Sequence, residues 1–469
     1  MATASGAGAD KWSGRAAFIL AAIGSAVGLG NLWRFPSEAG TNGGGAFVVF
    51  YVACVILIGL PVLLSEVLIG RHGQTSAPGS VRRVARESGA SEAWSILATV
   101  GMLGAFLIIS FYSVLGGWVL FYVGEFLTDF AGSLGDFTGG AFAGRTAEDI
   151  QTLLPALFAN NTALLGLHAI FMAITVFVVA RGVSGGIEVV ATWLMPTFFV
   201  LFLGITIYGA FTGDFAAALG FLFTFEPEKL TSGVMLSALG QAFFSLSLGS
   251  ALMITYGAYA GREVNLASTS AIIACADTGV AIIAGLAIFP IVFAAGLAVD
   301  GGPTLMFQTL PTSFMAMPAG SLIGLLFFVM VFFAALTSSV ALLEAPTVWA
   351  IDRFGGSRPK TALIVGGLAF LIGVFAALSF NILADVHPLS FIPLFEGQGV
   401  FDMLDTLTGK VLLPVAALIT SIFIGWVADR RLIDSENGIS GGLHRIYRFL
   451  IAWLCPVALI AILLFGIIG

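Results

Sequence analysis

Long apolar runs recur along this chain of 469 residues, and they constrain its fold more than any other feature. A bilayer core of roughly 30 Å needs about 20 apolar residues per spanning helix. Hydrophobic residues make up 58% of the chain and charged residues only 10%, whereas about a quarter of a soluble protein is charged. We therefore predict an all-α integral membrane protein.

Eleven runs have the length and composition of membrane-spanning helices. They fall at about 16–37, 46–70, 95–127, 162–180, 188–212, 234–258, 267–297, 318–351, 361–379, 402–427 and 446–467. We expect one transmembrane domain over residues 1–469, with no cleaved signal peptide and no twelfth membrane helix. The stretch at about 128–161 is expected to be an ordinary extracellular loop.

Basic residues indicate the orientation, because cytoplasmic loops of membrane proteins are enriched in Lys and Arg. With the N-terminus in the cytoplasm, 15 of the 19 Lys and Arg residues fall on the inner side. The remainder are Arg34, Arg145, Lys229 and Lys410. The sequence thus predicts a multi-pass plasma-membrane protein with a cytoplasmic N-terminus and an external C-terminus.

Several function classes lack support in the composition. The net charge of -7 does not indicate a nucleic-acid partner, and Cys54, Cys275 and Cys455 show no paired spacing. The four histidines are scattered, so neither a metal cluster nor the catalytic constellation of a membrane-embedded enzyme is expected. An ion channel would need a ring of filter residues or a polar pore helix, which the sequence does not show.

Two of the runs contain residues that interrupt a helix. The first carries Gly24-Ser25-Ala26-Val27-Gly28-Leu29-Gly30-Asn31, and the sixth carries Phe244-Ser245-Leu246-Ser247-Leu248-Gly249-Ser250. A glycine in a helix interior costs about 1 kcal/mol relative to alanine. Close helix packing through small residues is the alternative explanation.

The spacing of these two runs favours a break in both helices. They lie five segments apart, which predicts a 5+5 inverted repeat of about 12–212 and 230–427, followed by an extra helix at about 443–468. Paired breaks in inverted halves indicate a binding site near the middle of the membrane. Freed carbonyls there can coordinate cations, and helix N-termini can receive an anionic group.

Three stretches now resemble a known family, the neurotransmitter:sodium symporters. They are Gly24 to Pro36 with the following Asn42-Gly43-Gly44-Gly45, the segment Gly240 to Gly249, and Leu336-Thr337-Ser338-Ser339. The resemblance covers nearly the whole chain and is strongest to the bacterial transporters of leucine and hydrophobic amino acids.

The resemblance implies a secondary active transporter of the bacterial inner membrane, and no enzymatic activity. It would couple sodium entry to symport of neutral, hydrophobic or aromatic L-amino acids by alternating access. A sodium-independent exchanger of the same fold is the alternative, but it predicts no hydroxyl pair at Thr337 and Ser338. The preferred amino acid, the sodium stoichiometry, proton countertransport and the oligomeric state stay open.

Two sodium ions are implied. The first site would use Ala26, Asn31, Ser245 and Asp277, and the second would use Gly24, Val27, Ala334, Thr337 and Ser338. Asp277 stands where better-known relatives have asparagine. Two sodium ions then balance the Asp277 and substrate carboxylates, so chloride is not expected; a protonated or structurally paired Asp277 is the alternative.

Gly28 indicates the class of substrate, because monoamine members of the family have an aspartate at the matching position. An amino acid that brings its own carboxylate is therefore implied. The resemblance implies a substrate site made of Ser25, Ala26, Leu29, Gly30, Ile108, Tyr112, Phe244, Ser245, Ser247, Ser250, Ser338 and Leu342.

The resemblance also implies two gates. Arg34 and Asp405 match the outer pair, and Asp352 matches the acidic half of the inner pair. Ala9 replaces the usual inner arginine, so Lys11 is the nearest substitute and the pairing partner is left open.

Two further acids lie within apolar runs. Glu66 is expected to bond the backbone of the broken sixth run, and both Glu66 and Glu344 are expected to be protonated structural residues.

Overall fold

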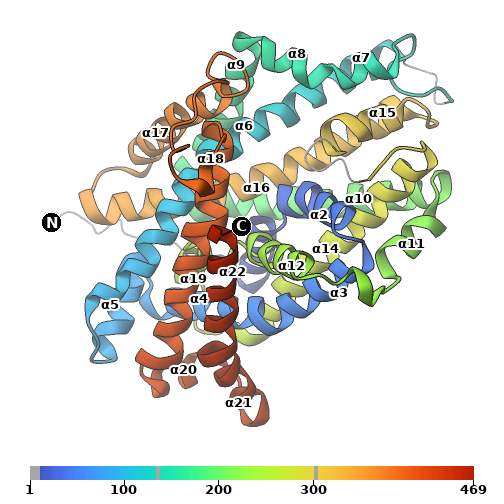
Figure 1. Ribbon diagram of the computed structural model, residues 1–469. Helices are drawn as coiled ribbons and strands as arrows, with labels where there is room; N and C mark the ends of the chain where they lie inside the picture. Colours follow the sequence, from blue (N-terminus) through green and yellow to red (C-terminus); the bar gives the residue numbers. More distant parts are fainter. Residues whose placement is uncertain (1–10, 134–137, 300–304, 469) are drawn as a thin grey trace.

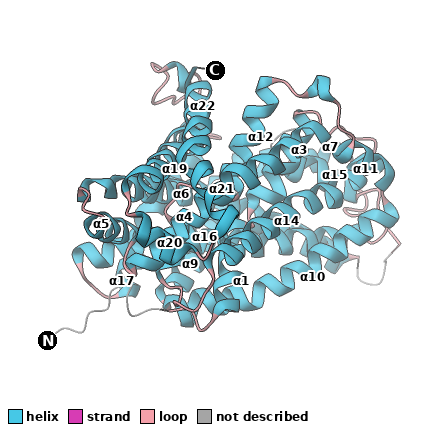
Figure 2. Cartoon of the chain, turned by 90° about the horizontal axis from the view of Figure 1, so that it is seen from below, coloured by secondary structure: helices cyan, strands magenta, loops and turns pink. Residues whose placement is uncertain are grey.

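The computed structural model describes residues 11–133, 138–299 and 305–468, which form helices and loops and no strand (Figure 2). In the first half of the chain the elements are α1 (Arg15–Ala26), η1 (Gly30–Arg34), α2 (Phe35–Thr41), α3 (Gly45–Cys54), η2 (Val55–Gly59), α4 (Leu60–Gly73), α5 (Ala77–Glu87), η3 (Glu92–Ser95), α6 (Ile96–Gly132), α7 (Ala147–Gln151), α8 (Leu153–Ala159), α9 (Asn161–Ala180), η4 (Val183–Ile187) and α10 (Glu188–Thr212).

The second half continues in the same way. In both halves α marks an α-helix, and η marks a short 3-10 or π-helical segment. Its elements are α11 (Phe215–Phe223), η5 (Pro227–Lys229), α12 (Ser232–Ser245), α13 (Leu252–Ala258), α14 (Leu266–Ala294), η6 (Leu305–Thr309), α15 (Leu310–Phe314), α16 (Gly320–Phe354), α17 (Arg358–Leu378), η7 (Pro393–Phe395), α18 (Val400–Thr406), η8 (Leu407–Leu412), α19 (Leu413–Ile422), η9 (Phe423–Val427), α20 (Arg430–Asn437), α21 (Gly441–Phe449), η10 (Leu450–Leu454) and α22 (Cys455–Ile468).

Among the described residues, up to ten helical segments have the length and composition of a membrane span, against the eleven predicted. Within the described residues, 9 continuous helical segments are long and apolar enough to cross a bilayer. A further span is the bent pair Arg15–Ala26 and Gly30–Thr41, whose axes differ by 47°. The predicted sixth segment is divided into the short helices α12 and α13, so neither half reaches the length of a span alone.

The break after α1 is a short extended stretch. The backbone of Val27 has ψ 103°, outside the helical region, before the chain turns helical again at Gly30. The break after α12 is longer, and residues 246–251 include three left-handed conformations: Ser247 (φ 53°), Gly249 (φ 74°) and Ala251 (φ 62°). Both predicted interruptions are therefore confirmed.

The second break is stabilised from outside its own helix. The Gly249 N–H donates to Glu66 Oε1 at 2.7 Å, as expected for Glu66. A Cβ on Gly249 would lie 2.1 Å from the carbonyl oxygen of Leu413, so only glycine fits here. A backbone group freed inside a membrane must find such a partner, because no water is available.

The helices α6 and α16 pack against each other at the centre, with α9 and α17 alongside them (Figure 1). In the same view α7, α8 and α15 lie at the upper right, while α5 and α20 lie at the lower left, at the opposite end of the molecule. The loop predicted at 128–161 is partly helical, because α7 and α8 both lie within it.

Charged side chains tie α20 to the end of α4. Arg71 Nη2 lies 2.7 Å from Glu436 Oε2, and His72 Nδ1 lies 3.2 Å from Glu436 Oε1. The hydrogen bond with His72, together with the positive charge of Arg71, lowers the pKa of the Glu436 carboxyl. This contact fixes the loop before the last membrane segment against the first repeat.

The backbones of α4 and α13 approach each other closely through glycines. A Cβ on Gly70 would lie 1.9 Å from the carbonyl oxygen of Ile254, and one on Gly257 would lie 2.5 Å from that of Val67. Small residues at such interfaces let membrane helices pack without a gap.

We predict that Gly70→Ala destabilises the protein by about 1–3 kcal/mol, because the added methyl group must push two backbones apart. The matched control is Gly124→Ala on α6, an exposed position where a Cβ meets nothing within 4 Å. Thermal unfolding in detergent should show a lower midpoint temperature for Gly70→Ala than for wild type. The midpoint of the control should be unchanged. Equal midpoints would contradict the close approach.

Candidate functional site

A small cavity of about 40 Å³ lies where the two helix breaks meet α6 and α16. Eleven of the twelve predicted substrate-site residues line it. The full lining is Ser25, Ala26, Gly28, Leu29, Gly30, Ile108, Tyr112, Phe244, Ser247, Ser250, Ser338, Leu342 and Leu413. The lining carries no ionisable carboxylate or ammonium group, so it suits a ligand without a charged side chain.

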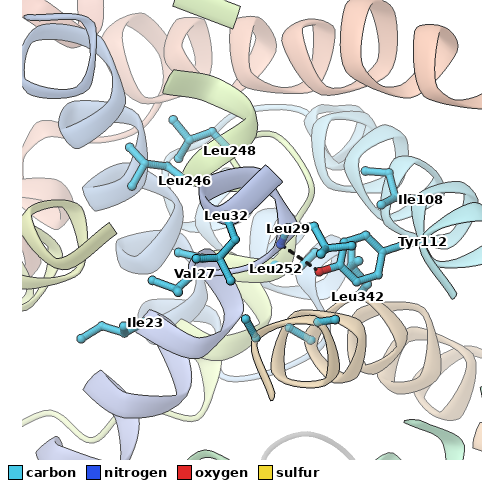
Figure 3. Packing of buried hydrophobic residues seen from close by; sticks show 14 of the residues in the cluster. Ile23, Val27, Leu29, Leu32, Ile108, Tyr112, Leu246, Leu248, Leu252 and Leu342 are labelled. Atoms are coloured by element: carbon cyan, nitrogen blue, oxygen red, sulfur yellow. Dashed lines mark hydrogen bonds between the residues drawn. The ribbon is translucent and has the colours of Figure 1, made fainter. Parts of the chain in front are cut away.

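The α1–η1 break forms one wall of this cavity. Figure 3 shows the Tyr112 ring beside Leu29, whose N–H donates to the Tyr112 hydroxyl at 3.4 Å. A Cβ on Gly28 would lie 2.5 Å from Ser338 Oγ and 3.0 Å from the Tyr112 hydroxyl oxygen. Any side chain at Gly28 would therefore fill the space between these two hydroxyls.

Three residues of the predicted first sodium site form one buried cluster. The amide nitrogen of Asn31 donates to Ser245 Oγ at 3.0 Å and to Asp277 Oδ1 at 2.8 Å, and Ser245 Oγ donates to Asp277 Oδ2 at 2.7 Å. All three side chains are buried. Ser245 belongs to this cluster and does not line the substrate cavity, which is where the structure departs from the predicted substrate set.

The predicted second sodium site is also brought together. Ser338 Oγ donates across the helix interface to the carbonyl oxygens of Gly24 at 3.2 Å and Val27 at 3.3 Å. Thr337 Oγ1 bonds back to its own helix, 3.1 Å from the Ala334 carbonyl oxygen. Ser338 therefore does not make the local helix bond that hydroxyls in membrane helices commonly make.

A second, larger cavity of about 300 Å³ lies next to the first, on the side of Arg34. Arg34, Asp405, Tyr112 and Phe244 all line it, and the Arg34 guanidinium stacks over the Phe244 ring at 4.4 Å. Within the described residues no ion pair joins Arg34 to Asp405; Arg34 instead lies 3.7 Å from Glu38. The predicted outer pair thus faces one cavity without closing it.

The opposite side is closed by aromatic packing. Trp12 is buried, its Nε1 donates to the Tyr256 carbonyl at 3.1 Å, and its ring meets the Tyr256 and Tyr259 rings edge to face. Ser13 N donates to Glu188 Oε2 at 3.0 Å, which holds the start of α1 against α10.

The predicted inner acid has another partner. Asp352 Oδ2 accepts from Thr75 Oγ1 and from Ser76 N, both at 2.9 Å. Lys11 makes no ion pair within the part of the chain that the structure describes, and Ala9 lies outside that part. The loop between α4 and α5 therefore occupies the carboxylate for which Lys11 was the candidate.

Glu344 lies in a buried ion pair, a partner that the sequence analysis did not predict. Arg358 Nη1 lies 2.9 and 2.8 Å from its two carboxylate oxygens, and the Tyr259 hydroxyl donates to Oε1 at 2.6 Å. Arg358 begins α17 and reaches back to α16 across a short turn, so a buried charge finds a compensating one.

Two residues of the site were missed by sequence reasoning. Leu413 completes the substrate cavity, and its position in an apolar run carries no distinguishing signal. Gln241 Nε2 donates to the Gly30 carbonyl at 2.9 Å and so stabilises the first break. A buried glutamine inside the apolar sixth run was a usable signal, since such a side chain needs a polar partner.

Comparisons with known proteins identify the family of this chain. The model of the sodium:neurotransmitter symporter family matches residues 9–132 and 141–469. The uncharacterised sodium-dependent transporter YhdH of Bacillus subtilis (strain 168) is 37% identical over 463 residues, which cover 97% of each chain. The sodium-dependent nutrient amino acid transporter 1 of Drosophila grimshawi is 27% identical over 477 residues, which cover 89% of this chain and 70% of that protein.

A solved structure is similar throughout. The crystal structure of MhsT in complex with L-phenylalanine superposes with a TM-score of 0.87 at 37% sequence identity, covering 97% of this chain and 99% of that one. Matched along nearly its whole length, the chain belongs to the sodium:neurotransmitter symporter family, whose members are membrane transporters and not enzymes.

Proposed function

We propose that the protein is a sodium-coupled symporter of neutral L-amino acids, most suitably hydrophobic or aromatic ones, that works by alternating access. One observation carries the proposal: an uncharged cavity at the α1–η1 break is flanked by two clusters of buried oxygen atoms, each of which includes a residue at or directly beside that break. Oxygen-rich sites suit a hard cation such as sodium.

The substrate would be held mainly by backbone groups. Its carboxylate would face the N–H groups of Leu29 and Gly30 and the Tyr112 hydroxyl, at the start of a helix where negative charge is favoured. Its amino group would face carbonyls around Ala26 and Ser247. The MhsT structure contains L-phenylalanine, which supports an apolar amino acid as ligand of this fold.

The side chain of the substrate would enter the apolar part of the cavity. Ile108, Leu342 and Leu413 line this part, and Ser250 adds a small residue that leaves room. A neutral pocket of this kind selects against a substrate with a charged side chain, because that charge would have no partner.

The first sodium ion would bind among Ala26, Asn31, Ser245 and Asp277. Asn31 now directs its amide nitrogen at Asp277, and an amide that turns over presents oxygen instead. Two sodium ions would balance the Asp277 and substrate carboxylates, so that chloride is not required.

The second sodium ion would bind among Gly24, Val27, Ala334, Thr337 and Ser338. The proposal is supported by the contact of Ser338 Oγ with the carbonyls of Gly24 and Val27, which gathers oxygens of α16 and of the first break. An ion here would link the helices that must move relative to each other.

The cavities support alternating access with the outer side open. The larger cavity leads to the substrate pocket from the side of Arg34, whereas Trp12 closes the other side. With the orientation predicted from Lys and Arg, the open side faces outward and the N-terminus is cytoplasmic. In a bacterium the protein would lie in the inner membrane.

Two sodium ions provide enough free energy for strong accumulation. Each ion that enters at about 100 mV releases about 2.3 kcal/mol. A tenfold concentration gradient adds about 1.4 kcal/mol per ion. Together two ions could support accumulation over roughly five orders of magnitude.

The direct test is uptake by purified protein in liposomes, with a survey of neutral L-amino acids. We expect accumulation of one or a few under an inward sodium gradient, unchanged when gluconate replaces chloride. Uptake that ignores sodium would overturn the symport proposal in favour of the sodium-independent exchanger.

Asp277→Asn tests the role of the buried carboxylate. The substitution removes the negative charge that would balance the second cation, so we expect uptake to fall at least tenfold in chloride-free buffer and to recover at least partly when chloride is added. Full chloride-independent uptake by this variant would contradict the assignment.

Gly28→Ala tests the geometry between the two hydroxyls. The new methyl group would displace Ser338 Oγ, so we expect a rise of at least tenfold in both the KM for substrate and the sodium concentration for half-maximal uptake. Gly166→Ala, at an exposed position of α9 with nothing within 4 Å, should leave both unchanged. Equal kinetics of the two variants would speak against this placement of substrate and ion.

A further inference from the structure

A groove of about 600 Å³ lies far from the transport site, where η9, α20, α21 and η10 meet. Figure 1 shows α20 and α21 at the lower ends of α19 and α22, which pack side by side. Three arginines line the groove: Arg430, Arg445 and Arg448. None of the functions assigned above uses it.

The charge of this groove is not compensated within the described residues. None of its three arginines makes an ion pair there, and its acid Asp434 pairs with His444 at 2.6 Å. The Nη1 atom of Arg448 is buried and finds no hydrogen-bond partner among the described residues. A buried guanidinium nitrogen without an acceptor is costly, so the groove is suited to an anion.

Arginine is the side chain that best matches a phosphate group, because its planar N–H groups bind two oxygens at once. Three arginines from α20 and α21 converge on one groove here. The chemistry therefore favours a phosphate over a single carboxylate.

Aromatic side chains show which source of phosphate fits. Trp426 and Trp453 are 57% and 56% exposed, their rings meet at 4.6 Å, and both line the groove with Phe449. The groove lies where the spans Val400–Val427 and Gly441–Gly466 are joined, and tryptophan is enriched at this depth of a membrane. Exposed rings beside the arginines suit acyl chains, which free phosphate lacks.

We propose that this groove binds the headgroup of an anionic phospholipid, with its phosphate on Arg430, Arg445 and Arg448 and its acyl chains along Trp426 and Trp453. The orientation predicted from Lys and Arg places the groove in the cytoplasmic leaflet, whose anionic lipids attract basic pockets between membrane helices.

The bound lipid would also stabilise the contact of this region with the first repeat. The Tyr447 hydroxyl of α21 lies 2.9 Å from Ser65 Oγ on α4, and Glu436 of α20 binds Arg71 at the end of α4. A headgroup that bridges α20 and α21 therefore holds two elements that both contact α4.

The test uses the full-length protein, delipidated in detergent and titrated with phosphatidylglycerol, with lipid-bound species counted by native mass spectrometry. At about 1 kcal/mol for each basic residue near an anionic lipid, Arg445→Gln with Arg448→Gln should bind about 30-fold more weakly than wild type. The control, Arg82→Gln with Arg353→Gln, removes two exposed arginines that do not line the groove and should bind like wild type. Phosphatidylcholine should not bind measurably to wild type or to either of these variants.

A second, milder variant separates weaker lipid binding from misfolding of the double variant. Arg445 is exposed, so Arg445→Gln alone leaves the packing of α21 intact and should weaken binding about fivefold. Equal affinity of wild type and both groove variants would overturn the proposal. It would also be overturned if inorganic phosphate displaced phosphatidylglycerol at equal concentration, which would assign the groove to a soluble anion.

Discussion

A polypeptide inside a bilayer must satisfy its own backbone hydrogen bonds, and this constraint governs the rest of the structure. The chain breaks two helices at membrane depth and so frees carbonyl and N–H groups. Some are taken up by side chains, as Glu66 does for Gly249 and Gln241 does for Gly30. The groups that remain face the small cavity and the oxygen clusters, which is why the site forms at the breaks.

The buried polar residues divide according to the partner they have. Glu344 is compensated by Arg358 and by the Tyr259 hydroxyl, and it contributes to the closed side of the protein. Asp277 contacts only neutral groups, Asn31 and Ser245 among them, within the described residues. A carboxylate without a cation in a membrane interior is costly, so the proposed sodium ion has a physical reason to bind there.

The two ends of the protein differ in how firmly they are held. At one end Trp12, Ser13 and Asp352 each have a partner on another element, so the start of α1 and the loop after α4 are fixed. At the other end Arg34 and Asp405 face the same cavity, and no bond between them is found among the described residues.

The sequence alone determined the class of protein and the positions of both breaks, because hydropathy and glycine content are local properties of the chain. The resemblance to a family added the assignment of Asp277 and Ser338, with the oxygen atoms around them, to two sodium sites. Only the tertiary structure decided that Asp352 binds Thr75 and that Leu413 completes the pocket. These contacts join residues far apart in the chain, and their distances depend on how whole helices pack.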